Sequence, residues 1–211
     1  MADRIAAAGG GLFVVASLVA GPLLPKPPAA DASAADIRTW YVGHHDALVT
    51  ASLTSVVGAL GLLVLVAGLR RRGDALAGLG GGLLVTMGVL GGLLQATAAQ
   101  VAPRLTDDGS LSLVYSLERA VFFDGPAVTA ILLLTAAAAT LPRWLGAFGV
   151  VVGLLGLVAG LGDLARRGGF PEAFGLSGFL LTVLWVALAS VTLARESSPA
   201  RAVGTPAPAV A

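Results

Sequence analysis

Six long apolar runs dominate the pattern of hydrophobic and polar positions along the chain. They cover residues 5–24, 47–69, 75–99, 120–141, 145–161 and 174–193. An α-helix needs about 20 apolar residues to cross the roughly 30 Å hydrocarbon core of a bilayer. Asp124 is the one fully charged residue inside these runs. The pattern predicts an all-α protein, a polytopic transmembrane bundle of six helices that fills residues 1–194.

The polar stretch after the first run predicts a short helix in the first outer loop, over residues 34–41. Ser33 and Asp36 resemble a capping box in which Asp replaces Glu. Trp40 and Tyr41 would then lie at headgroup depth, where amphipathic aromatic rings concentrate. We expect Asp46 to cap the helix of the second run, because Asp is a strong N-cap residue. Residues 103–110 are expected to form a polar loop.

Arginine placement predicts the orientation of the bundle. Arg4, the triple Arg70-Arg71-Arg72, Arg143 and Arg195 lie close to helix ends on one side. Basic residues in short loops mark the cytoplasmic side of a membrane protein. We therefore expect both termini in the cytoplasm of a bacterial cell, with the bundle in the plasma membrane. The first helix is expected to be retained, and the Pro- and Ala-rich tail, residues 195–211, to be a disordered cytoplasmic segment.

Composition supports this class and excludes others. Hydrophobic residues make up 56% of the chain and charged residues 12%, about half the charged share of a soluble domain. A net charge of +1 indicates no nucleic-acid partner, so the expected partner is the lipid bilayer. The chain has no cysteine, which excludes disulfides, thiolate metal sites and a cysteine nucleophile. No sequence motif indicates a cofactor.

The sequence around Asp124 allows two structural interpretations. It precedes Gly125-Pro126, and Asp followed by Pro in the first turn is typical of a helix start. Alternatively the helix continues from Leu117, and Asp124 faces a polar cavity beside Glu118 and Arg119. Ionisable groups within a membrane are costly and are functional candidates by default.

The pair His44-His45 does not form a chelating site by itself. Adjacent helical residues point about 100° apart, and metal-binding pairs are spaced three or four residues apart. The histidines are expected to be polar anchors at the interface, with proton handling as the alternative. The predicted polar pocket at the outer end consists of His44, His45, Asp46, Gln95, Glu118, Arg119 and Asp124, with no catalytic residue and no metal ligand assigned.

Glycines recur every three or four residues in the fifth run, at Gly149, Gly153, Gly156 and Gly160. Such stripes let helix backbones approach closely in lipid. The stripe predicts packing inside the bundle, and a homo-oligomer through the same face is the alternative.

Two local patterns resemble a known family. Ile37, Trp40, Tyr41 and His44 form an Ile-x-x-Trp-Tyr-x-x-His stretch after a Pro-rich loop, and residues 141–146 form a Leu-Pro-x-Trp-Leu-Gly turn. Both patterns are similar to those of an uncharacterised six-helix integral membrane family of high-GC bacteria, a domain of unknown function. The resemblance implies a topology and a location for the chain, and it implies no activity.

The sequence therefore favours a non-enzymatic integral membrane protein: a sensor, an accessory subunit or a transporter-like module with an outward-facing polar pocket. The alternative is an intramembrane enzyme that uses His44 or His45 with Glu118 or Asp124. Catalytic spacing is missing for the second class, and the charged candidates lie toward one face of the membrane rather than at its centre.

Overall fold

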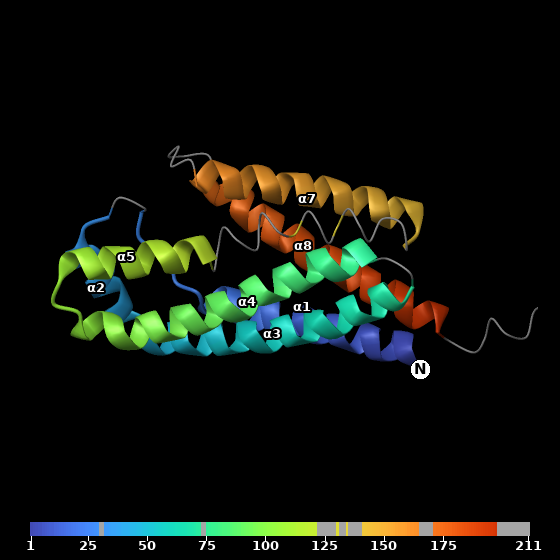
Figure 1. Cartoon of the computed structure of the whole chain (residues 1–211), viewed down its shortest axis with the longest axis horizontal. Helices are drawn as coiled ribbons and strands as arrows, with labels where there is room; N and C mark the ends of the chain where they lie inside the picture. Colours follow the sequence, from blue (N-terminus) through green and yellow to red (C-terminus); the bar gives the residue numbers. More distant parts are fainter. Residues whose placement is uncertain are drawn as a thin grey trace, which may run out of the picture.

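The computed structural model describes residues 1–29, 32–72, 75–121, 130, 134, 141–164 and 171–197. Every regular element within these residues is a helix (Figure 1). The helices are α1 (Ala2–Leu23), α2 (Ala34–Gly43), α3 (His45–Arg71), α4 (Ala75–Val101), the 3₁₀ turn η1 (Ala102–Arg104), α5 (Asp108–Arg119), α7 (Arg143–Leu164) and α8 (Pro171–Glu196).

Four of these segments are long and apolar enough to cross a membrane. They are Ala2–Leu23, His45–Arg71, Gly78–Arg104 and Gly178–Glu196, and α7 adds a shorter apolar helix over Arg143–Val158. The all-α prediction is confirmed, and the helices fit a membrane protein. The predicted fourth span, residues 120–141, lies mostly outside the described residues, so the count of six remains a prediction. The predicted disordered tail was wrong at its start, because α8 includes Arg195 and Glu196. Beyond Ser197 the tail lies outside the described residues.

Small residues set the distance between neighbouring helices. Where α1 crosses α3, a Cβ added at Gly61 would lie 2.6 Å from the backbone oxygen of Gly9. A Cβ at Gly68 would lie 2.3 Å from the Cβ of Ala6. Residue numbers rise along one helix as they fall along the other, so α1 and α3 are antiparallel. Their backbones are in contact, which is how helices without bulky side chains gain packing energy in lipid.

The pair α7 and α8 packs in the same antiparallel way. The Trp185 indole of α8 donates a hydrogen bond of 3.0 Å to the carbonyl of Leu145, beside Gly149 of α7. Gly178 of α8 approaches Gly156. Two glycines of the predicted stripe therefore face α8 of the same chain. A homo-oligomer through this stripe remains a prediction.

Three helix ends meet at one end of the bundle. The Arg72 guanidinium, after α3, forms ion pairs of 3.0 Å with Asp3 of α1 and 2.6 Å with Glu196 of α8. Arg4 of α1 donates to the carbonyl of Ser197 at 3.4 Å. The start of α1, the end of α3 and the end of α8 therefore lie together, on the right in Figure 1.

The opposite end carries a second, separate core. The main core joins α1, α3, α4, α7 and α8 and includes Leu65, Leu69, Trp185 and Leu193. The second core joins α2, α5 and η1 to the neighbouring ends of α3 and α4. We call α2, η1 and α5 the cap. It lies on the left in Figure 1.

The predicted short helix is present, with its expected N-terminus. Ser33 is the N-cap of α2, and its hydroxyl accepts a 3.2 Å hydrogen bond from the Asp36 backbone N–H. The helix continues to Gly43, two residues beyond the predicted end. Trp40 and Tyr41 are 7% and 0% exposed and pack inside the cap. The depth of the two aromatic residues relative to a membrane remains a prediction.

Two further local predictions were wrong. Residues 103–110 were expected to form a loop, but η1 occupies its start and α5 begins at Asp108. The Asp107 side chain caps α5, accepting a 2.6 Å bond from the Ser110 N–H. Asp46 does not cap α3, which starts at His45; its carboxylate contacts the His45 ring at 2.9 Å. Asp46 still lies in the first turn, where the helix dipole favours negative charge.

Candidate functional site: a buried carboxyl network in the cap

The amphipathic helix α5 brings a carboxyl group into the protein interior. Leu111, Tyr115 and Glu118 are four and three residues apart and form its buried face. Leu113 and Leu117 lie on the other face and are 69% and 51% exposed. Residues spaced three or four apart share one side of a helix. Packing of Leu111 and Tyr115 into the second core therefore places Glu118 against α2 and α4.

Four polar side chains from four helices form one chain of contacts. Gln95 of α4 donates from Nε2 to Glu118 Oε1 at 2.8 Å. Tyr41 of α2 donates from its hydroxyl to Glu118 Oε2. Ser52 of α3 lies 2.8 Å from Gln95 Oε1 and 2.6 Å from the Leu48 carbonyl, and its one hydroxyl proton serves these two acceptors. We call Tyr41, Ser52, Gln95 and Glu118 the carboxyl network.

The network is closed to solvent. Glu118 is 1% exposed, and Gln95, Ser52 and Tyr41 are each 0% exposed. Within the described residues no Lys, Arg or His lies at ion-pair distance from Glu118. Its hydrogen-bond donors are therefore neutral groups. Burying a charge without a counter-charge is expensive, so such a group tends to bind a proton instead.

The electrostatics of Glu118 follow from this burial. Loss of hydration raises the pKa of the Glu118 carboxyl above its usual range, and the hydrogen bonds from Tyr41 and Gln95 oppose that shift. Burial also raises the pKa of Tyr41, and the neighbouring Glu118 adds to the rise. The tyrosine hydroxyl therefore stays protonated. The titratable proton of the network is therefore the one on Glu118, whose pKa lies above its usual range.

Aromatic rings surround the network on the α2 side. Trp40 packs edge-on against Tyr41 at 4.9 Å and against Tyr115 at 6.2 Å between ring centroids. The Tyr115 hydroxyl donates a hydrogen bond of 2.5 Å to the carbonyl of Pro28. The same carbonyl accepts a hydrogen bond of 3.2 Å from the Arg119 guanidinium. The buried Trp40 Nε1 makes no hydrogen bond within the described part of the chain. These contacts attach the segment before α2 to α5.

Arg38 connects α2 with the start of α5. Its guanidinium donates a hydrogen bond of 3.0 Å to the Leu105 carbonyl and one of 3.2 Å to the Asp108 carboxylate. The Asp108 side chain is 73% exposed, so this pair contributes little to stability by itself. The pair lies at the outer edge of the cap, whereas Glu118 lies on its inner side.

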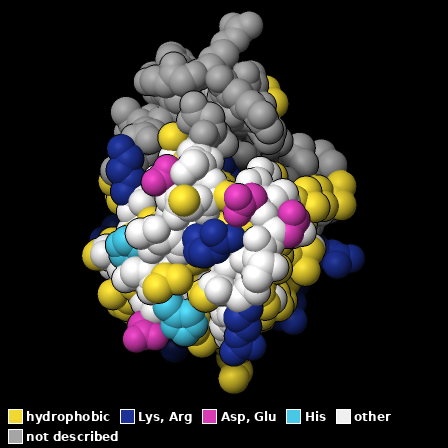
Figure 2. Space-filling view, turned by 90° about the vertical axis from the view of Figure 1, so that its left-hand side faces the viewer, with side chains coloured by type: hydrophobic (Ala, Val, Ile, Leu, Met, Phe, Trp, Pro, Cys, Tyr) yellow, Lys and Arg dark blue, Asp and Glu magenta, His cyan; other side chains and the backbone are white. Residues whose placement is uncertain are grey.

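The predicted pocket residues separate into three groups. Gln95 and Glu118 come together in the carboxyl network, and Arg119 lies beside it on Pro28. His44, His45 and Asp46 stay at the surface, with His44 Nδ1 2.9 Å from the Trp40 carbonyl and His45 on Asp46. Asp124 lies outside the described residues. Figure 2 looks at this end and shows histidine, basic and acidic side chains among apolar ones.

Sequence reasoning missed two members of the network, Tyr41 and Ser52. Tyr41 was assigned to the membrane interface, and Ser52 was one serine within an apolar run. Their partners are 77 and 43 residues away in the sequence. The i, i+4, i+7 pattern of Leu111, Tyr115 and Glu118 was a usable signal, because it marks one buried helical face that contains an acid.

The described residues contain no cluster of three or more His, Cys, Asp or Glu side chains arranged to hold a metal ion. The predictions of no metal and no cofactor remain predictions. The network can do one kind of chemistry as it stands, which is to bind and release a proton on Glu118.

No family model, curated protein or solved structure matches the chain. The described residues form an all-helical fold, and its apolar helices fit a membrane protein.

Proposed function

We propose that the chain is a six-span, non-enzymatic module of the bacterial plasma membrane that responds to protons through Glu118. The observation that carries the proposal is the burial of this carboxyl among neutral donors from α2 and α4. Its protonation state changes the stability of the contact between the cap and the bundle. A local protonation event that biases a packed element is a general way to build a sensor.

The direction of the response follows from charge burial. The protonated carboxyl is neutral and fits the apolar cap. The ionised carboxylate keeps its two hydrogen bonds but loses hydration, which favours conformations in which α5 separates from α2 and α4. Rising pH outside the cell would therefore loosen the cap. Tyr41 and Gln95 donate to Glu118, Ser52 contacts Gln95, and the adjacent Arg119 donates to the Pro28 carbonyl. The Tyr41 hydroxyl stays protonated, because its pKa is raised.

The intramembrane-enzyme alternative has less support. His45 contacts Asp46 at the surface, whereas both oxygens of Glu118 are engaged with Tyr41 and Gln95. A catalytic pair would need these two side chains within hydrogen-bond reach of each other or of a shared substrate atom. The position of the network in the cap, rather than midway along the bundle, also favours a sensor over a transporter.

The proposed topology predicts opposite labelling of two engineered cysteines. A chain without native cysteine suits this measurement. Gly109→Cys, in the cap, should react with a membrane-impermeant maleimide in intact cells, because we place the cap outside. Arg71→Cys, at the end that holds Asp3 and Glu196, should react only after the cells are permeabilised. The reverse pattern would place the cap in the cytoplasm and contradict the orientation.

Hydrogen exchange tests the proposed response directly. After correction for intrinsic exchange rates, protection of α2 and α5 amides should fall in the purified wild-type protein as the pH rises above 4.5, the ordinary pKa of a glutamate. Glu118→Gln keeps the shape but cannot ionise, so its protection should stay constant over this range. Asp46→Asn, an exposed carboxylate at the same end, is the matched control and should behave like wild type.

Two outcomes would contradict the proton-responsive role. One is protection of α2 and α5 that does not change with pH in the wild type. The other is the same change in the wild type and in Glu118→Gln, because the response would then belong to another group.

A further inference from the structure

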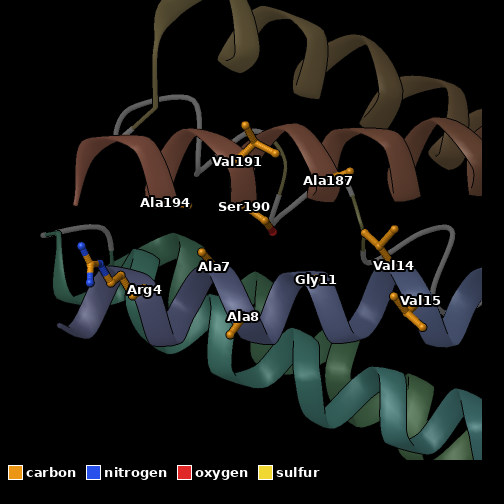
Figure 3. A pocket seen from close by; sticks show the side chains of 10 residues that line it. All are labelled: Arg4, Ala7, Ala8, Gly11, Val14, Val15, Ala187, Ser190, Val191 and Ala194. Atoms are coloured by element: carbon orange, nitrogen blue, oxygen red, sulfur yellow. The ribbon is translucent and has the colours of Figure 1, made fainter. Parts of the chain in front are cut away.

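An apolar groove runs along the surface between α1 and α8. It has a volume of about 510 Å³, within the range of about 300–1,000 Å³ typical of small-molecule sites. Figure 3 shows small side chains along it, with Arg4 at one end and Val14 and Val15 at the other. Its small residues include Ala7, Gly11 and Ala187.

Close helix contact forms the floor of the groove. A Cβ added at Gly10 would lie 2.0 Å from the Ser190 hydroxyl, so the helices touch there. One residue further along, a Cβ added at Gly11 would meet no heavy atom within 4 Å. The absence of a side chain at Gly11 therefore leaves space along the surface without being required by helix packing.

The groove has the length of one lipid tail. Arg4 and Val15 are eleven positions apart on α1, which corresponds to roughly 16 Å at about 1.5 Å per residue. One leaflet of a bilayer contributes half of the roughly 30 Å hydrocarbon core. An acyl chain lying in the groove would therefore run from the bilayer centre to its surface.

The charge at the end of the groove selects the headgroup. Arg4 is exposed, and its one hydrogen bond that the structure shows is a 3.4 Å contact to the Ser197 carbonyl. It lies at the end of the bundle that also holds Arg70, Arg71 and Arg195. Basic positions between membrane helices at the cytoplasmic side are suited to anionic headgroups.

We propose that this groove binds an anionic phospholipid, with one acyl chain between α1 and α8 and the phosphate on Arg4. The inference is independent of the proton-responsive role of Glu118, since the two features lie at opposite ends of the bundle. Arg4 supplies the preference for negative charge, and Gly11 supplies the room for the chain.

Native mass spectrometry of the full chain, with phosphatidylglycerol or phosphatidylethanolamine added to the detergent, tests the proposal. The wild type should bind one phosphatidylglycerol more tightly than phosphatidylethanolamine, by roughly fivefold for one arginine at the surface. Arg4→Gln should abolish this preference. Arg143→Gln, an exposed arginine outside the groove, should retain it.

Two glycine variants separate this groove from a smaller one between α3 and α4, which Arg70, Arg71 and Gly82 line. Gly11→Leu should fill the α1–α8 groove and weaken binding of both lipids. Gly82→Leu, where an added Cβ also meets no heavy atom within 4 Å, should leave lipid binding in the α1–α8 groove unchanged. Unaltered binding by Gly11→Leu, a retained preference in Arg4→Gln, or a second copy of the chain in place of lipid would each overturn the proposal.

Discussion

Glu118→Leu should lower the free energy of unfolding by about 2–6 kcal/mol. Two buried donors, the Tyr41 hydroxyl and the Gln95 amide, would lose their acceptor. Each buried polar group left without a partner costs about 1–3 kcal/mol. Leucine occupies a similar volume to glutamate, so the loss comes from the unpaired donors more than from an empty space. Unfolding in detergent, followed by circular dichroism, measures the effect.

A second variant distinguishes lost hydrogen bonds from general disruption. The triple variant Tyr41→Phe, Gln95→Leu, Glu118→Leu removes the donors together with their acceptor. Replacing all partners with apolar groups is often nearly neutral, so the triple variant should be more stable than Glu118→Leu alone. If the single variant is as stable as wild type, Tyr41 and Gln95 have other partners and the carboxyl network is not a unit.

Gly61→Ala should destabilise the bundle by about 1–3 kcal/mol, the usual cost of overpacking. The new Cβ would lie 2.6 Å from the Gly9 oxygen and 3.0 Å from the Phe13 nitrogen. Both are backbone atoms, which cannot move aside without shifting α1. The lost contacts would extend to the neighbouring pair Ala6 and Gly68, because α1 and α3 pack along their length.

Gly11→Ala is the matched control for this effect. Its added Cβ meets nothing within 4 Å, so the change should stabilise the helix by up to about 1 kcal/mol through propensity. Thermal unfolding of the two variants in the same detergent gives the comparison. Equal stability of both variants would mean that close backbone contact does not determine the spacing of α1 and α3.

The main helices could be predicted because hydrophobic length is a local property. The apolar runs that end at Leu24, Leu69 and Ala99 correspond to α1, α3 and α4 within a few residues. The N-cap at Ser33 was also predictable, since capping depends on residues three apart. The small amphipathic helix α5 was missed because its mixed polar and apolar sequence contains Asp108-Gly109, which favours a turn.

The site was only partly predictable for a different reason. Gln95 and Glu118 stood out as polar groups near or within apolar segments, and the structure brings them together. Tyr41 and Ser52 join them through contacts between four helices, which no local pattern encodes. The histidines attracted attention because imidazole titrates near neutrality, yet His44 and His45 contact their own neighbours at the surface.

The central claim is that Glu118 binds a proton in the folded protein. Burial raises the pKa of this carboxyl above the ordinary value of 4.5. The folded state therefore holds the proton over a pH range in which the unfolded state has released it. Stability from this group is complete below the unfolded pKa and is lost as the pH rises through the folded pKa.

The most direct test is the free energy of unfolding of wild type and Glu118→Gln, measured in detergent across this range. Other titrating groups are common to both proteins, so the difference between them isolates Glu118. We predict that the stability of wild type relative to Glu118→Gln falls as the pH rises above 4.5. A difference that stays constant, or that grows with pH, would show that the folded protein does not favour protonated Glu118 and would contradict the account.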